Sequence, residues 1–351
     1  EIYDINPDLV LLCGGTDGGN KEVIIANAKH LVAIDRPFTT IVAGNKSAND
    51  DIKAIFDEAG KDVVITANVM PQFNKLNIEP ARDAIRQLFI SRIIEAKGLN
   101  ILQSMTSYKI IPTPLAVLHA CELLSKGTKT QQGRGDLLAV DIGGATTDVY
   151  SMASGEPTVD NTMLKGLPEP WMKRTVEGDL GMRYSLTHVY EQIPGSDNPE
   201  NEYMQQVKAW VELCTARPDT LAAPGSEEEK LEEFLGRSAV SMAVERHCGR
   251  IADVFTPLGL MHTQEGKDLM NVPSVIGIGG VLRNSRRPEE ILKGSLYDFM
   301  HPECTKPRKP KFYLDQKYIF ASMGLLRSIN PELAFELLDK ETVEIGCNAT
   351  V

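Results

Sequence analysis

The most informative segment of this sequence covers residues 138–149 and reads LAVDIGGATTDV. An apolar strand, Leu137–Ile142, carries a carboxylate at Asp141 and ends in the pair Gly143-Gly144. Glycines permit a sharp turn and leave the backbone amides open to an anion. Because a carboxylate repels a phosphate, Asp141 suits a hydrated Mg²⁺ or an oriented water. A tight β-hairpin with a capping aspartate is the alternative for the same pattern.

A second glycine pair, Gly279-Gly280, ends another apolar strand, Ser274–Ile278, far along the chain. The signals of a helix start follow near Pro288. A backbone without side chains lets a flat ring lie against it. Two such turns, if folding brings them together, can hold the two ends of one nucleotide. Taken alone, the second pair is explained equally well by a plain strand-to-helix turn.

The first hundred residues alternate short apolar runs with stretches of helical spacing. The runs are Leu9–Cys13, Thr39–Ala43 and Val63–Thr66. Short, fully apolar runs of this kind predict parallel strands that are buried on both faces. The loop after the first run, Gly14–Asn20, fits an anion site at a helix N-terminus and a plain glycine turn equally well. A long helix is expected to open near Glu79 and to stop at Gly98.

The second half follows a polar, glycine-rich linker at residues 126–136. Residues 193–233 are acidic and rich in Pro and Gly, which predicts a variable excursion with one helix around Tyr203–Leu213. A helix over Leu235–Ile251 and a strand pair within Val254–Met261 are expected next.

Composition excludes several classes of protein. The chain has 351 residues, of which 42% are hydrophobic, so two or three domains with real cores are expected. A net charge of −11 argues against nucleic-acid and membrane partners, because both attract basic surfaces. No signal peptide or membrane-spanning run is visible, and we expect a cytoplasmic protein.

Cysteine and histidine spacing predicts neither disulfides nor a zinc site. The six cysteines lie far apart and form no CxxC pair, as expected for reduced and mostly buried thiols. The isolated histidines are expected to be structural: His119, His188 and His247.

The two glycine turns, in this order, resemble the second phosphate motif and the adenosine motif of the actin/Hsp70/sugar-kinase ATPases. Further segments resemble the accessory (MutL-type) family of adenosylcobalamin-dependent glutamate mutase, and this resemblance covers nearly the whole chain. These segments are residues 7–20, 43–45, 68–71, 112–114, 165–170, 173–181 and 311–315. Nothing resembles the DNA mismatch repair protein of the same short name.

The resemblance implies ATP and Mg²⁺ as ligands and assigns a role to each motif residue. Asp141 faces the Mg²⁺ through water and also faces the attacking water, as the catalytic residue. The implied phosphate contacts are Gly143, Gly144, Ala145, Thr146 and Thr147, with Glu177 and Asp179 near the nucleotide. Adenosine lies by Gly279, Gly280 and Val281. For the charged group Lys173, Arg174, Glu177, Asp179 and Arg183, a structural salt-bridge network is the alternative, and a solvated helix face is expected for Glu245 and Arg246.

The implied fold is α/β: an actin-like ATPase core of ribonuclease H-like type, N-terminally truncated, with an inserted βα-repeat domain. Residues 1–75 form that domain, which swivels or binds a partner. Residues 76–136 complete the first ATPase lobe and linker, and residues 137–351 form the second lobe. The first phosphate hairpin of such ATPases, D-x-G-S/T, does not occur before Ile142. We therefore expect the chain to begin inside a longer protein, with ATPase activity when full length and weak ATP binding by these residues.

The implied function is that of an ATP-dependent, chaperone-like factor that reactivates an adenosylcobalamin-dependent mutase of the glutamate mutase type. ATP hydrolysis would drive domain motion, the mutase subunits would be the partners, and cobalamin would be bound by the partner alone. Two alternatives stay open. One is a nucleotide-binding scaffold without turnover, and the other is a small-molecule kinase of the same superfamily.

Overall fold

The computed structural model describes residues 2–96, 105, 110–257 and 259–346, and the chain divides into two compact units. Unit 1 comprises Glu1–Ile111 and unit 2 comprises Pro112–Val351. Each unit buries its own hydrophobic core. No helix in the described part of the chain is both long and apolar enough to cross a membrane.

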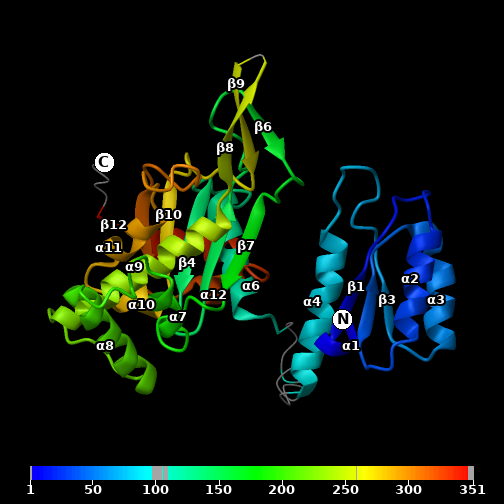
Figure 1. The fold of residues 1–351 in the computed structure, drawn as a ribbon, viewed down its shortest axis with the longest axis horizontal. Coiled ribbons are helices and arrows are strands. Elements are labelled where there is room, and N and C mark those ends of the chain that lie inside the picture. The colour runs from blue at the N-terminus through cyan, green and yellow to red at the C-terminus, as the bar shows by residue number, and fades with distance from the viewer. Residues whose placement is uncertain (1, 97–104, 106–109, 258, 347–351) are drawn as a thin grey trace. The chain divides into compact units, whose positions relative to one another are not determined.

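Unit 1 is built on a three-stranded parallel sheet in the order β1-β2-β3. Its strands are β1 (Leu9–Leu12), β2 (Thr39–Val42) and β3 (Val63–Ile65), and its helices are α1 (Ile2–Ile5), α2 (Glu22–Val32), α3 (Asn49–Glu58) and α4 (Glu79–Ala96). Helices α2 and α3 lie together on one side of the sheet and α4 lies on the other (Figure 1). The central strand β2 is buried along its whole length, as the apolar runs predicted, whereas β1 and β3 are only partly buried and Leu11 of β1 is exposed, so burial on both faces was wrong for these two strands.

The Gly14–Asn20 loop of unit 1 is held by the buried side chain of Asn45. Its Oδ1 accepts from the amide of Gly18 at 3.1 Å, and its Nδ2 donates to the carbonyl of Gly19 at 3.0 Å. A Cβ on Gly44 would lie 2.3 Å from Cδ1 of Ile24, so the chain passes this point without a side chain. These internal contacts favour the glycine-turn alternative for the loop over an anion site.

Unit 2 is built on a six-stranded mixed sheet in the order β12-β11-β10-β4-β5-β7. The strands are β4 (Leu137–Ile142), β5 (Thr147–Met152), β7 (Met172–Glu177), β10 (Ser274–Ile278), β11 (Lys311–Asp315) and β12 (Thr342–Ile345). The three central strands β4, β10 and β11 are parallel, while β5, β7 and β12 are each antiparallel to their inner neighbour. The mixed α/β class expected from the sequence is confirmed.

Helices cover both faces of this sheet. Alternate residues of β4, namely Leu138, Val140 and Ile142, pack in one core with helix α9 (Glu227–His247). The opposite face of β4 meets α6 (Thr113–Lys126), on which α12 (Phe320–Leu326) packs. The other described helices of unit 2 are α7 (Leu186–Glu191), α8 (Glu202–Ala216), α10 (Gly280–Asn284), α11 (Pro288–Leu292) and α13 (Pro331–Glu341), with a 3₁₀ turn at Lys293–Ser295; unit 1 has a 3₁₀ turn at Lys46–Ala48.

A separate three-stranded sheet forms an arm on unit 2. It consists of β6 (Thr162–Lys165), β8 (Arg250–Thr256) and β9 (Gly259–Glu265) in the order β6-β9-β8. Figure 1 shows the arm projecting beyond the main sheet. The strand pair predicted within Val254–Met261 is the outer part of this hairpin.

Three boundaries differ from those expected. Helix α9 begins at Glu227, within the supposed excursion, because Ser226 caps it and three glutamates in its first turn suit the helix dipole. It ends at His247 and not at Ile251, which belongs to strand β8. The two units divide between Ile111 and Pro112, which places α6 in unit 2, although the sequence grouped residues 76–136 together. Helix α4 opens at Glu79 as expected, and its predicted stop at Gly98 lies outside the described residues.

The closest helix contact in unit 2 requires a glycine. An added Cβ on Gly324 of α12 would lie 1.8 Å from the carbonyl oxygen of Ala116 on α6. We expect Gly324→Ala to lower the free energy of unfolding by about 3 kcal/mol, because the packed helices must separate. Gly178→Ala, where nothing lies within 4 Å, should change it by no more than about 0.5 kcal/mol. Equal urea midpoints for the two variants would contradict this packing.

Candidate functional site

The first glycine turn joins β4 to β5, and its carbonyl oxygens face the protein. The amide of Gly143 donates to the carbonyl of Thr146 at 2.9 Å. The carbonyls of Gly143 and Gly144 accept, at 2.8–3.0 Å, from the amides of Met182, Arg183 and Tyr184. Within the described part of the chain, no protein acceptor is recorded for the amides of Gly144, Ala145 and Thr146. These amides are therefore available to an anion.

The segment that supports this turn also needs a glycine. A Cβ on Gly181 would lie 2.2 Å from the carbonyl carbon of Ala145, and the Ser185 hydroxyl donates to the oxygen of that carbonyl at 2.9 Å. Gly181 and Ser185 thus hold the turn in place from behind.

The second glycine turn lies directly beside the first. Strand β10 is parallel to β4, with Ile278 in register with Asp141, so both strands end at the same edge of the sheet. Gly279 has φ +101°, and a Cβ there would lie 2.4 Å from the Ile142 carbonyl oxygen and 2.7 Å from Oδ1 of Asp141. Only glycine allows both this conformation and this approach.

The two turns open into one pocket of about 600 Å³, a size typical of small-molecule sites. Of the predicted residues, Gly143, Gly144, Gly280 and Val281 line it. The other walls come from α9, from the segment before it and from the end of α10. Residues there that the sequence did not predict as site residues include Leu221, Pro224, Glu229, Glu232, Glu233, Asn284 and Arg286. For the three glutamates, the run of acidic residues at the start of α9 was the signal in the sequence.

Ion pairs tie the pocket walls together. The Arg183 guanidinium, beside the first glycine turn, contacts Glu232 of α9 at 2.6 Å and the carbonyl of Thr220 at 3.1 Å. Glu233 is buried and forms an ion pair with Arg287. Because Glu232 and Glu233 are both paired, much of the acidic charge of this wall is neutralised.

Three carboxylates lie in one row across the sheet. Asp141 is directly opposite Asp148 on β5, and Asp315 ends β11 on the far side of β10. In-register neighbours share a face and strands are about 4.8 Å apart, so the Cα atoms of Asp141 and Asp315 lie about 10 Å apart. Asp148 is paired with Arg174 at 2.7 Å.

Burial first, and then the charges of Asp148 and Asp315, raise the pKa of Asp141 to about 6 against the lowering effect of Arg174. A carboxyl with a pKa near neutrality can exchange a proton with a reacting group. In the described residues, no group of three His, Cys, Asp or Glu side chains is placed to hold a metal ion.

Several predicted contacts lie apart from the pocket lining. The Thr147 hydroxyl is buried and donates to the carbonyl of Leu180, and that of Thr146 donates to Asp148 at 3.2 Å. Glu177 and Asp179 both bind Arg246, at 2.7 and 2.8 Å, which is the salt-bridge alternative raised for them. The solvated face expected for Glu245 and Arg246 is therefore wrong, since Arg246 is paired with two carboxylates and Glu245 is paired with the buried Lys306 at 3.0 Å.

The cysteines are free, as expected. Four are buried, whereas Cys13 is exposed, and Cys347 lies outside the described residues.

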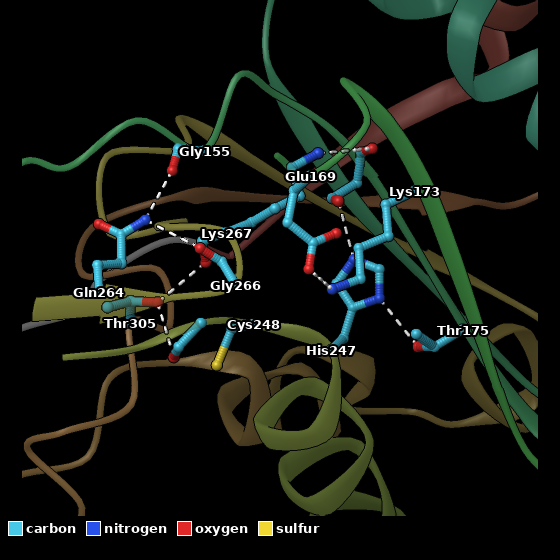
Figure 2. Close-up of polar contacts among 12 residues, drawn as sticks. Gly155, Glu169, Lys173, Thr175, His247, Cys248, Gln264, Gly266, Lys267 and Thr305 are labelled. Atoms are coloured by element: carbon cyan, nitrogen blue, oxygen red, sulfur yellow. Dashed lines mark hydrogen bonds and ion pairs between the residues drawn. The ribbon is translucent and has the colours of Figure 1, made fainter. Parts of the chain in front are cut away.

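A second buried polar cluster lies at the root of the arm (Figure 2). Both ring nitrogens of His247 bond hydroxyls, Nδ1 to Thr175 at 2.9 Å and Nε2 to Ser151 at 2.8 Å. Burial, then Lys173 and Lys267, hold the pKa of His247 well below its ordinary value. His247 is therefore neutral and structural, and it connects α9 to β5 and β7.

Lys267 in the same cluster is fully buried and donates to the carbonyl of Trp171 at 2.8 Å. Within the described residues it forms no ion pair with a carboxylate. Burial, followed by the charge of Lys173, lowers the pKa of Lys267 to about 8.

Fold and site define a mixed α/β protein in which two strand-to-glycine turns open into one pocket. The family model described as MutL protein matches residues 1–342. "Protein MutL" of Clostridium tetanomorphum is 46% identical over 348 residues, covering 98% of this chain and 75% of that protein. The chain belongs to the MutL family, as its motifs predicted.

We expect Asp141→Asn to stabilise the protein at pH 7.5. The folded pKa of Asp141, about 6, exceeds its ordinary value of 3.8, so wild-type stability falls as pH rises through this interval. One unit of pKa corresponds to about 1.4 kcal/mol. The variant's gain in free energy of unfolding should therefore approach about 3 kcal/mol above pH 6 and disappear below pH 4. Urea unfolding at a series of pH values measures it, and a gain that did not depend on pH would contradict the assignment.

We expect Lys267→Met to remove the dependence of protein stability on pH in the alkaline range. The pKa of Lys267 in the folded protein, about 8, lies below its ordinary value of 10.5. Between these two pH values the Lys267 amine is therefore protonated in the unfolded chain and mostly neutral in the folded protein. Wild-type stability should therefore rise with pH from 8 to 10.5, by about 3 kcal/mol relative to the variant. Parallel stability curves for the two proteins in this range would show that the buried amine does not titrate there.

Proposed function

We propose that the pocket binds ATP. The main support is that two glycine turns on neighbouring strands open into one pocket. Three amides of the first turn have no protein acceptor among the described residues. The amides of Gly144, Ala145 and Thr146 suit phosphate oxygens, and Gly279, Gly280 and Val281 suit the adenosine. Asp141 is the group that we assign to Mg²⁺, through water, and the ion would supply neutralising charge to the phosphates.

We assign Asp141 the role of orienting and deprotonating the attacking water. The water oxygen forms a bond to the terminal phosphorus, and its proton passes to the Asp141 carboxylate. The bond from that phosphorus to the bridging oxygen breaks, and its electron pair leaves with ADP. The raised pKa of Asp141 suits a group that takes up a proton near neutral pH.

Sheet topology supports an actin-like core of ribonuclease H-like type. Counted from β4, the first five strands of the sheet lie in the spatial order third, second, first, fourth and fifth, and only the second is antiparallel to the others. This is the strand arrangement expected for such a core. Strand β12 adds an antiparallel edge.

Membership of the MutL family supports the wider role. We propose a cytoplasmic accessory factor that uses ATP hydrolysis to reactivate an adenosylcobalamin-dependent mutase of the glutamate mutase type. Cobalamin stays on the mutase, and unit 1, with its own sheet and core, is the part that we propose contacts it.

Gly144→Val tests the pocket, because a side chain at this position enters it while its Cβ meets Arg183 at an ordinary 3.7 Å. We expect the variant to bind Mg·ATP at least about 10-fold more weakly by calorimetry. Gly178→Val, which has open space and lies outside the pocket lining, is the matched control. Equal affinities for wild type and both variants would place the nucleotide elsewhere, and no binding by wild type would remove the proposal.

Comparing wild type with Gly144→Val also tests the proposed reactivation of the mutase. With mutase inactivated by hydroxocobalamin, ATP and the full-length wild-type protein should restore turnover when fresh adenosylcobalamin is added, and the same protein carrying Gly144→Val should not. ATP binding without hydrolysis would instead favour the scaffold, and ATP consumption only with a small alcohol would favour the kinase.

A further inference from the structure

Asn284, the last residue of α10, carries a hydrogen-bond acceptor in the wall of the proposed nucleotide pocket. Its side-chain amide nitrogen donates to the carbonyl of Gly280 at 2.7 Å, one helical turn back. Because a carbonyl oxygen only accepts, this bond determines which end of the side-chain amide is the nitrogen. Among the described residues no donor to Oδ1 of Asn284 is recorded, so this oxygen is available to a ligand.

The charged side chains in and beside this part of the pocket already have partners. The hydroxyl oxygen of Ser285 accepts from the amide of Arg287 at 3.1 Å. The ion pairs are Arg286 with Glu229 at 3.8 Å, Arg183 with Glu232 at 2.6 Å, and Arg287 with Glu233. Since each pair neutralises its own charges, the Asn284 oxygen is suited to an uncharged donor such as an amino group.

A short strap before α9, residues 220–225, supplies an apolar wall of the same pocket. The carbonyl of its first residue accepts from Arg183 at 3.1 Å, and the amide of its last residue donates to Glu229 at 2.6 Å. Between these fixed ends Leu221 lines the pocket, although 78% of the residue is exposed. An exposed apolar side chain in a pocket gains free energy when a ligand covers it. A flat, largely apolar ring suits this wall.

Helix geometry places Asn284 beyond the second glycine turn. Four residues separate it from Gly280, which at 1.5 Å per residue is about 6 Å along α10. In the proposed binding mode the phosphates lie by Gly144 and the adenosine lies by Gly280. A base that rests on the second glycine turn can therefore bring one of its edges to Asn284.

We propose that Asn284 selects the nucleobase by accepting a hydrogen bond from the 6-amino group of adenine, while Leu221 covers the ring. The inference rests on the proposed binding of ATP and adds which base the pocket prefers and why. A 6-oxo purine, such as guanine or hypoxanthine, has an oxygen at the same position. Two acceptors then face each other without a proton between them, which a site built for a donor rejects.

Comparing ATP with ITP tests the role of Asn284, because inosine carries an oxygen at position 6 and a proton on N1. By calorimetry, the full-length wild-type protein should bind Mg·ATP about 10-fold more tightly than Mg·ITP. Asn284→Ala should bind Mg·ATP about 10-fold more weakly than wild type and should bind the two nucleotides equally. Asn271→Ala, at an exposed position outside the pocket lining, is the matched control and should keep both wild-type affinities.

Leu221→Ala tests the apolar wall separately. The variant should weaken the binding of ATP and ITP by the same factor, about 5-fold, because contact with the ring does not depend on the group at position 6. Unchanged affinity for both nucleotides would show that the base does not lie against the strap and would overturn the role of Leu221.

The outcomes separate this inference from the proposed function. Wild type that binds neither nucleotide would defeat both. Wild type that binds ATP and ITP equally would leave a nucleotide pocket but overturn base selection, and this measurement needs no variant. An Asn284→Ala protein that kept the wild-type preference for ATP, with a wild-type urea midpoint, would overturn the role of Asn284 alone.

Discussion

The site depends on the close approach of two parallel strands, β4 and β10, at their carboxyl ends. At Gly279 the backbone of β10 comes so near to Ile142 and Asp141 that a single added carbon would overlap the Ile142 carbonyl oxygen. This approach carries both glycine turns to one edge of the sheet and lets one pocket reach both. Ligand sites of open α/β sheets characteristically lie at this edge. Without glycine at this position the strands would separate, and the turns would no longer share a pocket.

Close pairing of these strands also concentrates charge. The register sets Asp141 opposite Asp148 and across β10 from Asp315, on a face covered by α6. Burial beside two carboxylates is unfavourable for an ionised aspartate, and Arg174 offsets only part of this cost. A protein selected for stability alone would have little reason to keep this arrangement. Retaining an unfavourable buried charge where two glycine turns meet is typical of a functional site.

Polar contacts elsewhere in the molecule are, by contrast, mostly satisfied. Asn45 fills the glycine loop of unit 1, Glu177 and Asp179 share Arg246, and Glu232 is paired with Arg183. These groups looked functional in the sequence or line the pocket, yet their partners show that they brace the fold. The ion pair of Arg183 is notable because it joins the first glycine turn to α9 and so keeps the pocket walls together.

Sequence alone predicted the three strands of unit 1, strands β4 and β10 with their glycine turns, the position of Asp141 and membership of the family, whereas β6, β7, β11 and β12 were not predicted. These features follow from short-range rules, since apolar runs, glycine conformations and contiguous motifs are properties of neighbouring residues. Only the tertiary structure decided that Glu229, Glu232 and Glu233 of α9 line the pocket and that Glu177 lies in an ion pair with Arg246. Each of these depends on strand register and on where a helix packs. Such contacts join residues far apart in the chain, and no local pattern encodes them.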